Sequence, residues 1–251
     1  MFLSNNKYNI VRVGDFATNA NTKLNYGIFS IGLCLDDYVM NNSFDCFIIL
    51  FYSTLIWTVI EFLLHITNTR CIKPMIFYYS NDNSQVVPHY VGLFLQGFQE
   101  GGCITTIGLY FGDRLNSFNH VIFLHTLIIF ILVNVGIKKM STERNSVRQV
   151  NTITSLVTMS TVTICNIKTL YEHQQHLYRQ LTMFFVMIYV SSWWTFAVWY
   201  KGFRSVEVHM KDNRDQYIVK KNDVCDTFLV LSYDVIFEIA MAYVFFYRFI
   251  M

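Results

Sequence analysis

A run of apolar residues from Phe44 to Ile66 is long enough to cross a lipid bilayer as one helix. Near its carboxyl end the run carries Glu61 and His65. Together with Thr54 and Thr58 they are spaced by four, three and four residues, so all four polar side chains fall on one side of a helix. A charged residue at the centre of a membrane helix costs about 2.5–3.5 kcal/mol on insertion scales. We therefore expect this polar stripe to face protein or water rather than lipid.

The composition extends this membrane interpretation to the whole chain of 251 residues. Hydrophobic residues make up 53% of it and charged residues only 14%, whereas soluble domains carry about 25% charged residues. A net charge of +2 without a dense basic patch argues against a nucleic-acid partner. We interpret residues 1–24 as a polar N-terminal arm, which lacks the apolar core of a secretory signal peptide. Residues 25–251 are expected to form a single transmembrane domain.

Six further apolar runs are candidate membrane spans. They cover residues 25–40, 86–112, 118–137, 150–170, 181–200 and 227–250. If all seven runs cross, the N-terminal arm shares one side of the membrane with loops 67–85, 138–149 and 201–226. That side then holds fifteen of the 19 lysines and arginines, as the positive-inside rule requires of the cytosol-like side. If the run 25–40 is instead a re-entrant segment, the division becomes twelve against seven.

We therefore predict an all-α membrane bundle of seven transmembrane helices, with six helices and a re-entrant segment as the alternative. Its N-terminus lies on the cytosol-like side and its C-terminus on the opposite side, in a membrane that the sequence does not identify. In loop 201–226, alternating residues on both sides of the turn sequence KDNRD predict a small β-hairpin.

The run 86–112 combines a small-residue face with an acid. Gly97, Gly101, Gly108 and Gly112 fall on one face, which would allow a neighbouring helix backbone to approach closely. We assign these four glycines to helix packing. Glu100 lies on an adjacent face.

Three further ionisable residues lie in apolar runs. His125 is deep in the run 118–137 and either belongs to a site or bonds to a nearby carbonyl group. Asp234 and Glu238 are one turn apart in the last run. Two carboxylates at so short a distance cannot both be charged in a low-dielectric environment without a large free-energy cost. One should therefore be protonated, or a cation should lie between them. The six cysteines show no CxxC spacing and are interpreted as small apolar side chains.

These ionisable residues define a predicted polar centre in which acids outnumber bases. Its members are Glu61, His65, Glu100, His125, Asp234 and Glu238. Such a centre should attract protons, metal ions or other cations, so translocation or binding of protons or cations is the favoured function. One alternative is a membrane-embedded enzyme that acts on a lipid, with a divalent metal held by Glu61, His65 and Glu100. A second alternative is a non-catalytic subunit of a homo-oligomer or of a larger membrane complex.

The stretch SYDVIFEIAMAYVFFYR at residues 232–248 bears on this last alternative. It resembles the last helix of the cytochrome c oxidase subunit three family. That family also has seven helices and a glutamate in its third helix, the position of Glu100 here, so the resemblance implies a subunit of a respiratory complex. The His-rich and Gly-rich signatures of the family are absent from this chain, and the resemblance is confined to this helix.

Overall fold

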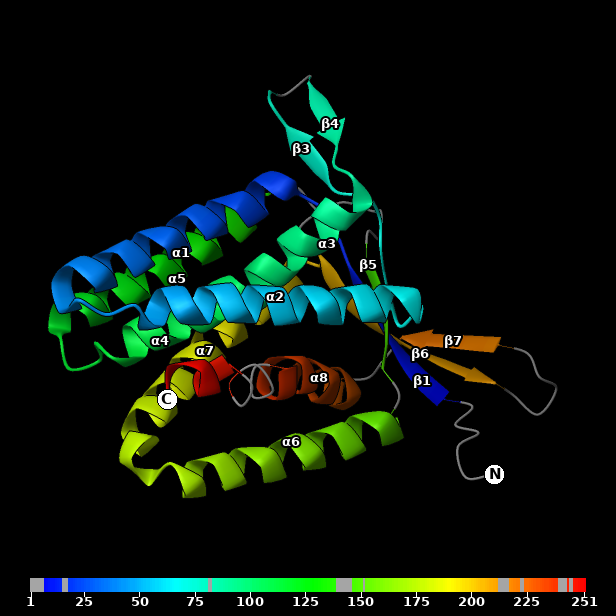
Figure 1. Ribbon diagram of the computed structural model, residues 1–251. Coiled ribbons are helices and arrows are strands. Elements are labelled where there is room, and N and C mark those ends of the chain that lie inside the picture. The colour runs from blue at the N-terminus through cyan, green and yellow to red at the C-terminus, as the bar shows by residue number, and fades with distance from the viewer. Residues whose placement is uncertain are drawn as a thin grey trace.

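The computed structural model describes residues 7–14, 18–80, 83–138, 146–150, 152–211, 217–221, 224–238, 243 and 246–251. Long helices lie side by side through most of the molecule, and a small β-sheet lies at one end of them (Figure 1). The C-terminus lies away from the sheet, while the first strand belongs to it.

Most of each expected apolar run is helical over the residues that the structure describes, although Val86 and Val150, at the starts of two runs, belong to strands. The helices are α1 (Ala20–Asn41), α2 (Asp45–Ile66), α5 (Phe118–Ile137), α6 (Thr152–Glu172), α7 (Leu177–Tyr200) and α8 (Val224–Ser232), which continues as the π-helix η4 (Tyr233–Glu238). Three of the described segments are long and apolar enough to cross a membrane, namely α2, α5 and Gln174–Tyr200, which joins the 3-10 turn η3 (Gln174–His176) to α7. This finding supports a membrane-associated helical protein.

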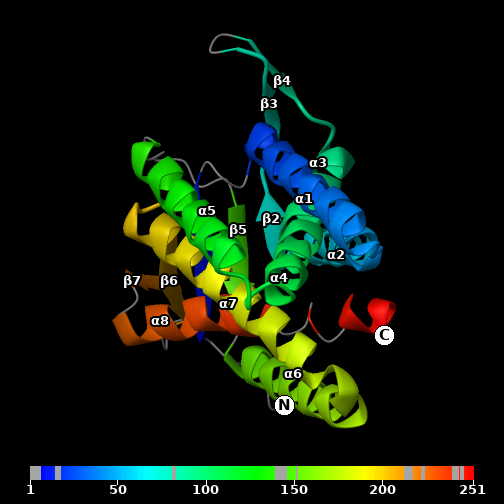
Figure 2. The ribbon, with the colours of Figure 1, turned by 90° about the vertical axis from the view of Figure 1, so that its left-hand side faces the viewer.

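Residues 89–112 of the expected run 86–112 form one continuous helical stretch with an irregular middle. The stretch comprises α3 (His89–Gly97), the π-helix η2 (Phe98–Cys103) and α4 (Ile104–Gly112). Viewed from the end opposite the sheet (Figure 2), this stretch lies inside the bundle and α6 lies at its edge. η2 packs mainly against α2, and α4 packs mainly against α7.

The glycines of this stretch lie against neighbouring backbones. A Cβ atom added to Gly97 would lie 2.6 Å from the backbone nitrogen of Thr58 on α2, and one added to Gly101 would lie 2.7 Å from the carbonyl oxygen of Ser53. On α7, Met183 approaches both Gly108 and Gly112. The small-residue face therefore serves contacts within this chain, where no side chain other than hydrogen fits without a shift of the neighbours.

The sheet contains strands from four separate parts of the chain. Its strands are β1 (Lys7–Val13), β2 (Arg70–Ile72), β5 (Ser146–Val150), β6 (Arg204–Lys211) and β7 (Tyr217–Lys221), in the order β2-β5-β1-β6-β7 and all antiparallel. β6 and β7 form a hairpin within loop 201–226. A second hairpin, β3 (Ile76–Tyr78) with β4 (Ser84–Val86), projects from the bundle (Figure 1).

The predicted all-α fold does not include this five-stranded sheet. The strands β2 and β5 have three and five residues, too few to show a clear alternation of apolar and polar side chains. β2 and β5 are distant in the sequence and lie side by side only in the folded chain. The N-terminal arm and the loops 67–85, 138–149 and 201–226 each contribute strands to this one sheet, so they lie at the same end of the bundle.

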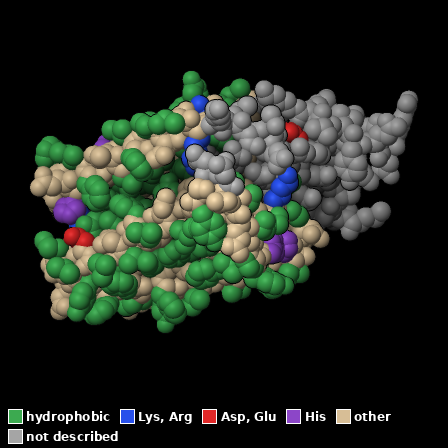
Figure 3. All heavy atoms as spheres, turned by 90° about the horizontal axis from the view of Figure 1, so that it is seen from above, with side chains coloured by type: hydrophobic (Ala, Val, Ile, Leu, Met, Phe, Trp, Pro, Cys, Tyr) green, Lys and Arg blue, Asp and Glu red, His purple; other side chains and the backbone are tan. Residues whose placement is uncertain are grey.

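Large apolar side chains cover the outer surface of the helices, as Figure 3 shows from above. Ile28 on α1, Phe130 on α5 and Ile164 on α6 each expose more than 60% of their surface. Soluble monomers rarely expose continuous apolar patches of this extent. An apolar exterior around long helices is the surface that lipid would cover.

Candidate functional site

The side chain of Arg70 lies between the buried acid Glu61 and the half-buried acid Glu100. Its Nη1 atom is 2.6 Å from Oε1 of Glu61 and 2.9 Å from Oε2 of Glu100, and its Nη2 atom is 2.9 Å from Oε1 of Glu100. Glu61 is 1% exposed and Arg70 is 8% exposed. One guanidinium thus joins α2 to η2 through charge-assisted hydrogen bonds, which are stronger than neutral ones.

A tight turn brings Arg70 back to the helix that precedes it. α2 ends at Ile66, and Asn68 adopts a positive φ of 54°, a conformation that Asn tolerates better than most residues. Its backbone N–H donates to the carbonyl oxygen of His65. β2 then begins at Arg70 and pairs with β5, where Arg148 lies opposite Arg70. The sheet therefore holds Arg70 beside the last turns of α2.

The irregular helix η2 supplies the other half of the site. A π-helix inserts one extra residue into a helix and often occurs at functional sites. Here it carries Gln99 and Glu100. The side-chain amide of Gln96 donates to Glu100, and the ammonium group of Lys23 on α1 donates to Oε1 of Gln99. We call the residues Lys23, Glu61, Arg70, Gln96, Gln99 and Glu100 the charge cluster.

The charge cluster contains two acids and two cations. Glu61 and Glu100 are accompanied by Arg70 and Lys23, two cations that the sequence interpretation leaves in the loop and arm of the cytosol-like side. Lys23 lies in the first turn of α1, outside the three candidate spans. Burial lowers its pKa from 10.5 to about 8, although the nearby charge of Glu100 acts to raise it.

Thr54, Thr58 and Glu61 face protein, as the spacing of the polar stripe predicts. Gly102 of η2 lies against Thr54, and Gly97 lies against Thr58. The two threonine hydroxyls donate to the carbonyl oxygens of Leu50 and Thr54, at 2.6 and 2.7 Å. The stripe therefore meets the helical stretch that carries Glu100.

A pair of histidines lies next to the charge cluster. The Nε2 atoms of His65 and His89 are 3.0 Å apart, and the ring centroids are separated by 4.3 Å. His65 is one turn from Glu61 on α2, so the two share a face. The Nδ1 atom of His65 is buried without a hydrogen-bond partner. His89 begins α3 and is not among the predicted site residues. In the sequence, only its position after Pro88 at the start of a helix distinguishes it.

The remaining predicted site residues lie elsewhere or outside the described side chains. His125 is exposed on α5, where its Nδ1 atom is 2.7 Å from the carbonyl oxygen of Val121 and its Nε2 atom is 3.3 Å from the hydroxyl of Tyr189. These partners are not members of the charge cluster. The backbone of Asp234 and Glu238 belongs to η4, and their side chains lie outside the described part of the structure.

The predicted metal ligands do not form a preorganised metal site. Glu61 and Glu100 share Arg70, and His65 contacts His89. Within the described ranges, no group of three or more histidine, cysteine or acidic side chains could hold a metal ion. A cation between Glu61 and Glu100 would have to displace the guanidinium group.

A second set of ion pairs lies at the other ends of these helices. Arg114 donates to Asp37 at 2.6 Å, joining the end of α4 to α1. Arg179 lies 2.7 Å from Asp45 and 2.8 Å from Asp113, and so joins α7 to α2 and to the end of α4. Ionic contacts therefore tie the helices together at both ends, with the large apolar core cluster between them.

Comparison of the chain with protein-family models, with curated proteins and with solved structures gave no match. The proposed function therefore rests on the geometry of the charge cluster.

Proposed function

We propose that the protein is a multi-pass membrane protein whose charge cluster takes up and passes on protons. The observation that carries this proposal is the sharing of Arg70 by Glu61 and Glu100 in a buried position, with Lys23 nearby. Ionisable groups inside a membrane bundle are costly, and in membrane proteins they commonly mark ion or proton pathways. Burial lowers the pKa of Lys23 to about 8, which brings this group closer to neutral pH than an exposed lysine.

The geometry favours protons over metal cations. Arg70 fills the space between the two carboxylates that a metal ion would use. A proton needs no such space, because it moves between groups that are already hydrogen-bonded. The half-buried His89 leads to His65, which is one turn from Glu61. Arg70 then joins Glu61 to Glu100, and Lys23 donates to Gln99, the residue next to Glu100 in the sequence.

Proton flux through liposomes that contain the purified protein tests this function. We expect Glu100→Gln to reduce flux at least tenfold, because the amide cannot ionise and Glu61 still pairs with Arg70 to preserve the fold. The matched control is Glu172→Gln, since Glu172 is an exposed acid on α6 that pairs with Lys168 at 3.6 Å. A pH-sensitive dye inside the vesicles reports flux under an imposed potential.

Two results would refute the proton proposal. One is wild-type flux no greater than that of protein-free liposomes. The other is equal flux in Glu100→Gln and wild type. Replacement of external Na⁺ by choline should leave the flux unchanged, and a flux that requires Na⁺ would instead favour cation transport.

The seven-helix topology is part of the same proposal. The sheet supports it, because it joins the four segments that the charge distribution assigns to one side of the membrane. In this arrangement the sheet is on the cytosol-like side. The turn between α4 and α5, which contains Asn116, is on the opposite side.

Labelling with a membrane-impermeant maleimide tests the topology. In a background with Cys71 and Cys165 replaced by serine, we expect Ser84→Cys and Asn116→Cys to react from opposite faces of sealed vesicles, because both positions are exposed and a span separates them. An N-terminal tag should be accessible from the same face as position 84. Reaction of both cysteines from one face would contradict the span. A tag on the face of position 116 would favour a re-entrant segment at 25–40.

A further inference from the structure

A cavity of about 490 Å³ lies between α1 and α5, with Trp194 of α7 contributing to its wall. Its volume falls within the range of about 300–1,000 Å³ that is common for small-molecule sites. Most of its lining is apolar or aromatic. Tyr26 and Trp194 meet edge to face with ring centroids 6.2 Å apart, and Phe29 and Phe123 lie at the same separation.

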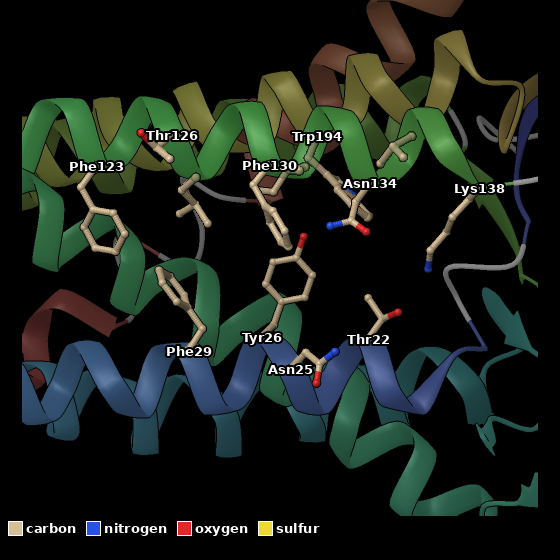
Figure 4. A pocket seen from close by; sticks show the side chains of 13 residues that line it. Thr22, Asn25, Tyr26, Phe29, Phe123, Thr126, Phe130, Asn134, Lys138 and Trp194 are labelled. Atoms are coloured by element: carbon tan, nitrogen blue, oxygen red, sulfur yellow. The ribbon is translucent and has the colours of Figure 1, made fainter. Parts of the chain in front are cut away.

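The cavity is polar at one end and apolar at the other (Figure 4). Lys138, Thr22, Asn25 and Asn134 lie toward one end, and Phe29 and Phe123 lie toward the other. Lys138 immediately follows the last residue of α5. A second cation lies at the same helix end, because the ammonium group of Lys201 donates to the carbonyl oxygen of Gly136 at 2.7 Å. Lys138 and Lys201 therefore place two cations at this end of α5, and Lys138 lines the cavity.

The length and placement of the cavity match one leaflet of a bilayer. Its lining on α5 extends from Phe123 to Lys138, which corresponds to about 22 Å at 1.5 Å per residue. With its headgroup region, one leaflet contributes about half of the roughly 40–45 Å thickness of a bilayer. The polar end adjoins the end of α5 on the sheet side, where lipid headgroups would lie if α5 crosses the membrane. The apolar end is at the depth of acyl chains.

We propose that this cavity binds an anionic phospholipid of the sheet-side leaflet. One acyl chain lies along Phe123, Phe130 and Phe29. The phosphate group lies near Lys138, and the amides of Asn25 and Asn134 can donate to its ester or headgroup oxygens. The cavity shares no residue with the charge cluster, so this inference stands whether or not the protein carries protons.

Native mass spectrometry of the purified full chain tests lipid binding, with phosphatidylglycerol and phosphatidylcholine of identical acyl chains as probes. We expect one phosphatidylglycerol per chain, retained about fivefold more strongly than phosphatidylcholine, the factor expected of one lysine beside an anionic headgroup. Lys138→Gln should abolish this preference while leaving phosphatidylcholine binding unchanged. Equal retention of the two lipids by the wild type would overturn the assignment of the anionic end.

A second variant separates the cavity from general lipid adhesion. Thr126→Trp should fill the cavity and reduce retention of both lipids at least tenfold. Thr163→Trp on α6 is the matched control, because both threonines are exposed and donate to a carbonyl oxygen one turn back in their own helix, at 2.9 and 2.8 Å. If both tryptophan variants retain lipid like the wild type, the bound lipid does not occupy the cavity and the proposal is wrong.

Discussion

Arg70→Ala is expected to lower the free energy of unfolding by about 3–5 kcal/mol, the usual cost of removing one partner from a buried ion pair. The change would leave Glu61, which is 1% exposed, and Glu100 without the guanidinium that they share. A buried carboxylate that loses its cation must be protonated or rehydrated, and each outcome opposes folding. Unfolding by sodium dodecyl sulfate in mixed micelles, followed by far-ultraviolet circular dichroism, would measure the change.

Two further variants separate the cost of unpaired charge from the loss of packing. Lys168→Ala removes a cation that is 69% exposed and pairs with Glu172 at 3.6 Å, so it should change stability by less than about 1 kcal/mol. The triple variant Arg70→Met, Glu61→Gln and Glu100→Gln removes all three charges and should recover most of the lost stability. If Arg70→Ala behaves like Lys168→Ala, the buried ion pairs do not stabilise the fold.

Gly112→Ala is the second change with a large expected effect. An added Cβ atom would lie 2.7 Å from the backbone nitrogen of Met183 and 2.9 Å from its Cα atom. Backbone atoms cannot move aside as a flexible side chain can, so α4 and α7 would have to separate. Overpacking of this kind typically costs about 1–3 kcal/mol. The same detergent titration should show the loss.

Gly32→Ala is the matched control for this substitution. Gly32 lies within α1, and nothing is within 4 Å of an added Cβ atom. Alanine favours a helix over glycine by about 1 kcal/mol, so Gly32→Ala should stabilise the protein slightly. Similar changes in both variants would show that helix propensity, rather than the contact with α7, governs the outcome.

The sequence predicts the individual helices well because their signals are local. The apolar run Phe44–Ile66 becomes α2 over Asp45–Ile66, and the run 118–137 becomes α5 with the same bounds. The spacing of Thr54, Thr58 and Glu61 correctly orients the inner face of α2. Each of these inferences depends on residues within a few turns of one another, where helical periodicity is a dependable guide.

The sequence does not predict all members of the charge cluster, because the contacts within the cluster join residues that are distant in the sequence. Glu61 and Glu100 stand out as acids in apolar runs, but Arg70 and Lys23 look like ordinary residues of a polar loop and arm. Arg70 is 30 residues from Glu100, and Lys23 is 76 residues from Gln99. The π-helix at Phe98–Cys103 has no local pattern that distinguishes it from an α-helix. Only the folded structure shows that Arg70 and Lys23 belong to the same cluster as Glu61 and Glu100.

The order of strands has a consequence for biogenesis. β1 precedes the other strands of its sheet along the chain, yet it lies in the middle of the sheet between β5 and β6. Its two neighbours begin at Ser146 and Arg204, so neither neighbour of β1 exists until several of the helices have been synthesised. Closure of the sheet therefore comes late in synthesis. Because β2 carries Arg70 and pairs with β5, we expect the charge cluster to be completed only after β5 has been synthesised.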